Sequence, residues 1–316
     1  MSNMPIPNTS INETMLQASG MLAKLSKQIT CSYPDLLNLY PVMEYVHTLD
    51  SSDPLQGFRY TPPLNHKWSS EIKALGGSSA LDNYHRMVLA FLITDFDNRI
   101  KGLRVPNSIL SLLAVTFQRI LAQLENTENN FYSQSNELFC KDLALCRLKL
   151  LPCGSELVDI YSGVPRNILL RDDLQQLVRC TKFFLRKGSG FRPWYESHWD
   201  RQLIRSFTPQ GYDLCYLRIA EMLELNPAIK GMMGSSWWFD PALESISPNL
   251  GFLRKLPLDN GAQLFRVGTS TTATRTAIHL SAERRQLYNS GKYRPTIYLL
   301  AWARKDMLEW ANRYSS

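Results

Sequence analysis

The sequence predicts an α/β or α+β protein in which a helical N-terminal half packs on a mixed α/β C-terminal half. Before residue 125, apolar residues recur every three to four positions, which is the spacing of amphipathic helices. After residue 135, helical patterns alternate with short apolar runs of strand length. The segment 125–135 between them is polar and rich in asparagine, as linkers are. We therefore expect a helical domain or subdomain over residues 1–135 and an α/β ligand-binding domain over residues 136–316.

The elements of the N-terminal half are all predicted to be helices. Helical periodicity covers residues 11–29, 34–48, 81–100 and 106–124. Pro34 suits a first helical turn, where its missing N–H costs nothing. Three prolines and a glycine in residues 51–63 predict a loop there.

The C-terminal half contains patterns of both kinds. Strands are predicted over residues 143–151, 229–239, 263–267 and 296–302. Helices are predicted over residues 212–225, 272–288 and 304–313. Residues 174–185 fit either a helix or a strand.

Length and composition exclude several protein classes. A chain of 316 residues with 44% hydrophobic, 11% aromatic and 20% charged residues matches a folded protein with a large core. The first ten residues lack the pattern of a signal peptide, and the apolar runs are far shorter than the roughly 20 residues of a membrane span. The six cysteines form no C-x-x-C pair, which indicates reduced thiols. We therefore expect a cytoplasmic protein without a membrane span.

The basic charge lies entirely in the C-terminal half. Residues 1–135 contain 10 Lys+Arg and 11 Asp+Glu, which leaves 25 and 17 for the remainder. Six of the seven tryptophans lie there too. This combination suits an anionic small molecule or cofactor with flat or apolar parts, although a solvated basic face over a core would have the same composition. It does not determine the oligomeric state.

A glycine turn stands at the centre of the most basic segment, residues 179–205. Phe183, Phe184 and Leu185 precede the turn, and Pro193 after it could begin a helix through Trp199. A strand, a glycine turn and a helix N-terminus together would bind an anion through backbone N–H groups and the helix dipole. The predicted cofactor-binding residues are Arg186, Lys187, Gly188, Ser189, Gly190 and Arg192. An ordinary exposed turn is the alternative.

The string from residue 234 to residue 241 is the most distinctive in the chain, because a predicted strand ends there in two hydroxyls and three aromatic side chains. Ligands collect at strand ends in α/β proteins, so these residues could form a substrate pocket. The predicted pocket residues are Ser235, Ser236, Trp237, Trp238 and Asp240. Packing of the aromatic rings in the core is the competing interpretation.

Residues 282–302 resemble the end of the GNAT-superfamily acyltransferases. In that family a helix bearing Leu-Tyr precedes a glycine–aromatic pair and a final strand, and Leu287, Tyr288, Gly291, Tyr293 and the strand 296–302 are similar. The resemblance implies acyl-coenzyme A as cofactor, Tyr288 as the general acid toward the leaving thiolate, and residues 187–190 as the phosphate loop.

Three functional hypotheses follow, from different classes. The first is an acyltransferase that moves an acyl group from a thioester of the coenzyme A type to an amine, with Glu196 or His198 as general base. The second is a nucleic-acid or anionic-partner binding module, in which Phe183, Phe184, Phe191, Trp194 and Trp199 stack on bases. The third is a non-haem iron oxygenase with His198, Asp200 and His279 as ligands. The acyltransferase, which needs no metal, is the favoured hypothesis.

Overall fold

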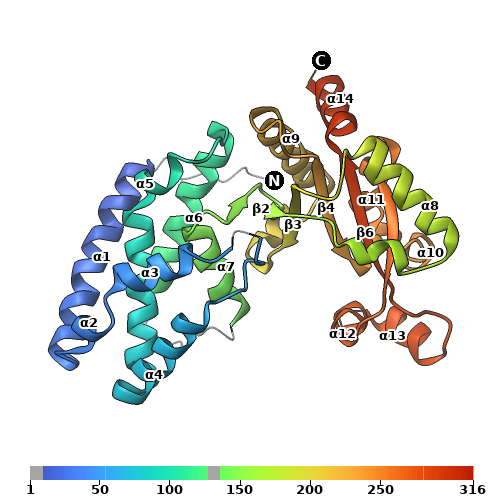
Figure 1. Ribbon diagram of the computed structural model, residues 1–316. Coiled ribbons are helices and arrows are strands. Elements are labelled where there is room, and N and C mark those ends of the chain that lie inside the picture. The colour runs from blue at the N-terminus through green and yellow to red at the C-terminus, as the bar shows by residue number, and fades with distance from the viewer. Residues whose placement is uncertain (1–9, 54, 127–135, 280, 316) are drawn as a thin grey trace. The chain divides into compact units, whose positions relative to one another are not determined.

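The computed structural model describes residues 10–53, 55–126, 136–279 and 281–315 and divides into two compact units, Met1–Pro152 and Cys153–Ser316. The first unit is helical, and the second combines helices with a mixed sheet (Figure 1). The predicted α+β organisation is therefore confirmed. Among the described residues, no helix is long and apolar enough to cross a membrane.

The first unit consists mainly of helices. They are α1 (Ile11–Ser32), α2 (Leu36–Leu39), α3 (Val42–Asp50), α4 (Pro63–Thr94), α5 (Phe96–Ile100), α6 (Asn107–Glu125) and α7 (Glu137–Cys146). Ser10 is the N-cap of α1 and forms a capping box with Glu13, and the buried residues of α1 recur every three to four positions. That face packs on α4 and α6.

Two predicted helix boundaries in this unit are wrong. The predicted helix 34–48 is split into α2 and α3, because Pro41 lacks the N–H that a continuous helix would use. The predicted start of the long helix at residue 81 lies inside α4, which begins at Pro63. Helical geometry breaks within α4 at Gly77, whose φ of 73° is accessible to glycine at little steric cost.

The predicted strand 143–151 is also wrong, because α7 occupies part of it. Residues 139–146 are all buried, so the amphipathic rhythm that distinguishes a helix from a strand is absent. Only β1 (Leu150–Pro152) is extended. Arg147 Nε donates to Asp50 at 3.0 Å and Lys149 Nζ to the Gln56 carbonyl at 2.9 Å. These contacts tie the segment to the helical unit, which extends to Pro152. Most of the predicted linker, residues 127–135, lies outside the described residues.

The strands of the second unit form a mixed sheet in the order β2-β3-β4-β6-β5. They are β2 (Glu156–Ser162), β3 (Trp194–Trp199), β4 (Gly231–Ser236), β5 (Gln263–Gly268) and β6 (Ile297–Ala303). Strands β3 and β4 are parallel and are connected through α9 (Pro209–Leu225), and the other neighbouring pairs of this series are antiparallel. The predicted strands 229–239, 263–267 and 296–302 correspond to β4, β5 and β6.

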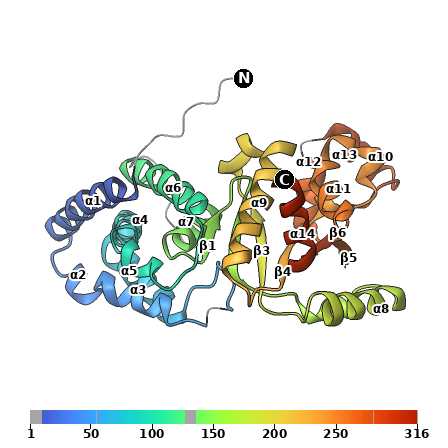
Figure 2. The same cartoon turned by 90° about the horizontal axis from the view of Figure 1, so that it is seen from above.

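Helices cover both faces of this sheet. One face carries α9, α11 (Phe252–Asp259) and α14 (Arg304–Ser315); the ring of Tyr216 on α9 lies 5.5 Å from that of Trp302 on β6. Figure 2 shows α9 and α14 on this side. The other face carries α8 (Leu174–Lys182), which continues as a π-helical turn, Phe183–Lys187. The short helix α10 (Leu243–Ile246) follows β4.

The predicted helices of the second unit are confirmed with one correction. Helix α9 begins after its N-cap Thr208, and α14 follows β6 directly. The predicted helix 272–288 is instead two helices, α12 (Thr271–His279) and α13 (Ala282–Asn289). A new helix starts because the Ser281 hydroxyl accepts from the Arg284 N–H as an N-cap.

Candidate functional site

The carboxyl ends of the parallel strands β3 and β4 form the candidate site. Their paired register runs from Tyr195–Met232 to Ser197–Gly234 and stops there, although each strand continues for two more residues. A side chain at Gly234 would bring its Cβ within 2.5 Å of Ser197 Oγ, so glycine permits this close approach. The ends of adjacent parallel strands are where ligands bind in open α/β sheets.

Two predicted catalytic residues lie together at these ends. Glu196 and His198 are two apart on β3, so their side chains share the face of the sheet that also carries α8. The Glu196 Oε2 atom lies 3.9 Å from His198 Nε2 and accepts a 2.6 Å hydrogen bond from Ser162 Oγ on β2. The side chains of Glu196 and His198 are 30% and 19% exposed. Both side chains are therefore partly open to solvent, although the His198 Nε2 atom itself is buried.

Ser235 is the predicted pocket residue that lies beside this pair. Met233 on β4 stands opposite Glu196, so Ser235, two residues further, shares its face with His198. Ser235 is exposed. Asp159 on β2 stands opposite Glu196 on the other side and is buried, with its Oδ1 accepting from the Tyr161 N–H at 2.9 Å. A polar row of Asp159, Glu196, His198 and Ser235 thus crosses three strands.

The aromatic residues at the strand ends lie mainly on the opposite face. Trp199 and Trp238 meet edge to face with ring centroids 5.6 Å apart, and Phe207 lies 5.1 Å from Trp238. Trp238 is half-buried. These rings could contact an apolar part of a ligand at the open end of the strands.

Ser236, Trp237 and Asp240 have structural roles instead. The Ser236 hydroxyl accepts from the Trp238 N–H at 3.1 Å, and Trp237 is buried under the Arg284 guanidinium, 5.0 Å from its ring. Asp240 accepts from the N–H groups of Ala242 and Thr296, and burial raises the pKa of its carboxyl above the usual range. Core packing thus accounts for these three, whereas Ser235 and Trp238 remain accessible.

The predicted acid Tyr288 lies on α13, where 38% of the residue is exposed. Its neighbour Leu287 packs on the cluster that contains Trp237 and Tyr293. Tyr293 is buried, and burial together with the Asp240 carboxylate raises the pKa of its hydroxyl. Of the two tyrosines, Tyr293 is therefore the one next to the end of β4.

The structure corrects the predicted anion-binding turn. Helix α8 precedes it and β3 follows it, so its order is helix, turn, strand rather than strand, turn, helix. The N–H groups of Gly188 and Gly190 donate to the carbonyls of Phe183 and Phe184 at 2.7 and 2.5 Å. The Ser189 carbonyl accepts from Lys230 Nζ. The turn uses these groups to close the end of the helix instead of presenting them to a ligand.

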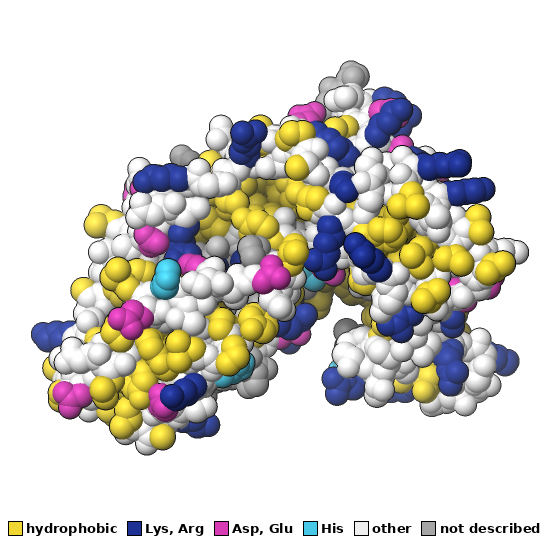
Figure 3. Space-filling view, in the orientation of Figure 1, with side chains coloured by type: hydrophobic (Ala, Val, Ile, Leu, Met, Phe, Trp, Pro, Cys, Tyr) yellow, Lys and Arg dark blue, Asp and Glu magenta, His cyan; other side chains and the backbone are white. Residues whose placement is uncertain are grey.

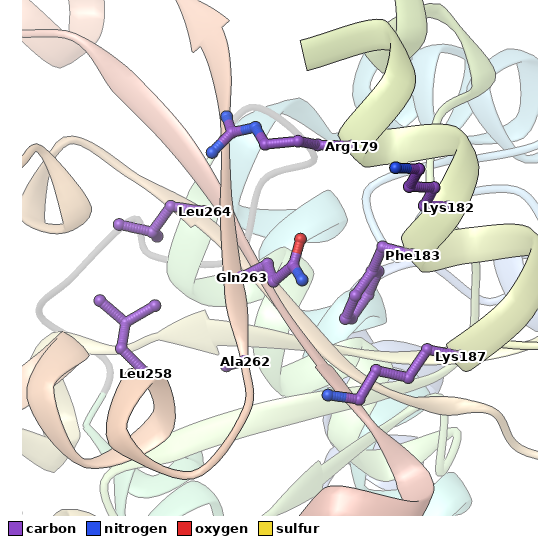
Figure 4. A pocket seen from close by; sticks show the side chains of 8 residues that line it. All are labelled: Arg179, Lys182, Phe183, Lys187, Leu258, Ala262, Gln263 and Leu264. Carbon is purple, nitrogen blue, oxygen red and sulfur yellow. The ribbon is translucent and has the colours of Figure 1, made fainter. Parts of the chain in front are cut away.

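Three of the basic side chains line one open groove, which we call the β5 groove (Figure 4). It has a volume of about 520 Å³ and is lined by Arg179, Lys182, Phe183, Lys187, Leu258, Ala262, Gln263 and Leu264. Lys187 Nζ pairs with Asp306 at 2.6 Å. Figure 3 shows further Lys and Arg side chains over the surface of the second unit. The predicted cofactor residues Arg186 and Arg192 are not among those that line the groove.

The residues of the two alternative sites, the base-stacking surface and the iron site, do not have the arrangement that these sites require. Phe183, Phe184 and Trp194 are buried between α8 and the sheet, so they cannot stack on bases. In the described part of the chain, His, Cys, Asp and Glu side chains form no group of three or more that could hold a metal ion. His198 lies on β3, Asp200 directly follows that strand and His279 ends α12, and these three proposed iron ligands do not form such a group.

Strand β2 was not predicted from the sequence, yet it supplies Glu156, Asp159 and Ser162 to the neighbourhood of the site. Glu156 is fully buried, and Tyr212 on α9 donates to its Oε1 at 3.1 Å. The run Leu157, Val158, Ile160 would have predicted this strand from its β-branched and apolar residues.

Comparison with known proteins gives no relative. The sequence matches no protein-family model, and no curated protein or solved structure is significantly similar to it. The chemistry of the site therefore rests on its own residues.

Proposed function

We propose that the second unit is an N-acyltransferase that moves an acyl group from a thioester of the coenzyme A type to an amine. The observation that carries the proposal is the partly exposed Glu196–His198 pair on β3, where β3 and β4 end in parallel beside Ser235. A histidine next to a carboxylate is a common general base near neutral pH. Transfer to an amine needs such a base, because an ammonium group cannot attack a carbonyl.

In this proposal His198 takes a proton from the acceptor amine while Glu196 stabilises the resulting imidazolium. The amine nitrogen forms a bond to the thioester carbonyl carbon and the C–S bond breaks. The thiolate that leaves then takes up a proton and is released as the free thiol. Ser235, exposed next to His198, can hydrogen-bond the acceptor or the carbonyl oxygen. The proton that the thiolate takes up comes from a water molecule or from Tyr288, which is 38% exposed on α13; Tyr293 is buried.

The rest of the donor would use surfaces around the same strand ends. The Trp199, Trp238 and Phe207 rings suit an apolar acyl or pantetheine chain. Arg201 and Arg205 are exposed in the 3₁₀ turn that follows β3, where they can attract phosphate groups. This turn, rather than residues 187–190, supplies the cationic side chains closest in sequence to the catalytic pair.

Isothermal titration with acetyl-coenzyme A and longer acyl homologues tests donor binding. We expect saturable heat with wild type and about tenfold weaker binding for the double variant Arg201→Glu/Arg205→Glu, because like charges repel the phosphates. Arg275→Glu is the matched control, since Arg275 is exposed on α12. The absence of heat with every homologue, or equal weakening by the control, would contradict the proposal.

A further inference from the structure

Strand β5 is the outermost strand at its end of the sheet, and a side chain covers part of its open edge. The Gln176 amide accepts from the Arg266 N–H at 2.6 Å and donates to the Arg266 carbonyl at 2.9 Å. A neighbouring strand would make the same two bonds. Gln176 is buried, so it holds this position as a fixed part of the fold.

Leu264 lies two residues earlier on the same edge. Because strand geometry repeats every two residues, its N–H and C=O point the same way as those of Arg266. No donor or acceptor within the described residues bonds these two groups, whereas the Ala262 N–H donates to the Pro257 carbonyl at 2.9 Å. The edge is therefore covered on both sides of Leu264 and open at Leu264 itself, which lines the β5 groove. An open edge is a template for an added strand.

The opposite wall of the groove is cationic. Arg179, Lys182 and Lys187 project into it from one side of α8 and its π-helical extension (Figure 4). Lys187 is neutralised by Asp306, but Arg179 and Lys182 have no carboxylate partner among the ion pairs of the described residues. Phe183 and Leu258 supply an apolar floor between the two walls.

We propose that the β5 groove binds an extended acidic segment of a partner protein, which adds to β5 as a further strand. One residue of the segment pairs its backbone with Leu264, and carboxylates at alternate positions face Arg179 and Lys182. From Arg179 to Lys187 the helix rises about 12 Å, and alternate strand residues are about 7 Å apart, so a segment of about five residues spans the basic wall.

Backbone chemistry favours a peptide over other anions. The Leu264 carbonyl requires a donor and its N–H an acceptor, and a peptide residue offers both in one plane. A phosphodiester backbone offers acceptors only. The basic wall and the open edge are therefore satisfied together by an acidic peptide.

Fluorescence anisotropy with a labelled peptide of alternating glutamate and valine tests this binding. We expect saturable binding at low salt and about tenfold or greater loss when the central residue is N-methylated, because methylation removes one ladder hydrogen bond and blocks the approach of the strand. A peptide with lysine in place of glutamate should not bind. Equal binding of the methylated peptide, or no binding of the acidic one, would overturn the proposal.

Charge-reversal variants locate the site. Arg179→Glu/Lys182→Glu should weaken binding about tenfold, since two attractive contacts become repulsive. Both side chains are exposed, so the fold should persist, and circular dichroism checks it. Arg186→Glu is the matched control, because Arg186 is exposed in the same segment but does not line the groove. Equal loss with the control would mean general charge attraction and would refute the assigned groove.

Discussion

Glu156 is a buried carboxylic acid that no sequence motif singled out. Its carboxyl is buried at the start of β2, where Tyr212 and Ser197 donate hydrogen bonds to it. Burial raises the pKa of Glu156 above its usual value of 4.5, and the two hydrogen bonds offset part of that rise. The folded protein therefore holds the proton of Glu156 more tightly than the unfolded chain does.

This difference predicts a pH dependence of stability. As pH rises above about 4.5, the unfolded chain releases the Glu156 proton before the folded protein does, so the free energy of unfolding falls until the folded pKa is passed. Glu156→Gln removes that dependence and keeps an acceptor for Tyr212. In urea unfolding between about pH 5 and 8, the free energy of unfolding of the variant should increase relative to that of wild type as pH rises.

Glu224→Gln, on the exposed face of α9, is the control for that series. A constant difference in the free energy of unfolding between wild type and Glu156→Gln across the pH range would contradict the raised pKa of Glu156 in the folded protein.

The catalytic candidates were partly predictable from the sequence. Glu196 and His198 were identified as bases, and the structure brings them within 3.9 Å. Their segment was expected to be helical, and its partners on β2 were not foreseen. Periodicity over six residues cannot separate a short buried strand from a helix, and pairing between β2 and β3 joins residues some 40 positions apart.

Among the elements, β4 depends most on a single small residue. Gly231 begins the strand, and a Cβ there would clash with the Trp302 carbonyl oxygen and meet the Trp194 ring at 2.6 Å. One of these neighbours is backbone, so neither a rotamer change nor a small shift relieves the contact. Glycine at this position lets β4 lie between β3 and β6.

We predict that Gly231→Ala destabilises the protein by about 1–3 kcal/mol, as overpacking of a core does. Gly20→Ala should act in the opposite direction, by about 0.5–1 kcal/mol, because Gly20 lies in α1 with open space around it and alanine favours the helix. Urea unfolding measures both. Equal stability of Gly231→Ala and wild type would show that β4 can shift.

Element type was predictable where one face meets solvent. Helices α1, α6, α9 and α14 and strand β5 follow their sequence patterns closely. Strand β6 is buried on both faces, and its run of apolar residues between a proline and a helix start still matched the strand pattern. Helix α7 was mistaken for a strand because it is buried all round, and the turn at Gly188 was given the wrong neighbours because Phe183 and Phe184 resemble strand residues.

At the scale of the whole molecule, the net charge differs between the two units. Residues 1–152 contain 13 Lys+Arg and 13 Asp+Glu, so the net charge of +7 belongs entirely to the second unit. The sequence predicted this bias, although it placed the boundary at residue 135. The unit that carries the excess also carries the Glu196–His198 pair and the β5 groove, which fits a protein that handles anionic ligands.

A thiol-release assay tests the central claim most directly. With acetyl-coenzyme A and a panel of amines that includes amino acids, polyamines and peptide N-termini, wild type should release free thiol. His198→Asn should lower the rate about 100-fold or more, as loss of a general base does, while His279→Asn on α12 leaves it unchanged. Full activity of His198→Asn, or no thiol release with any amine, would contradict the account.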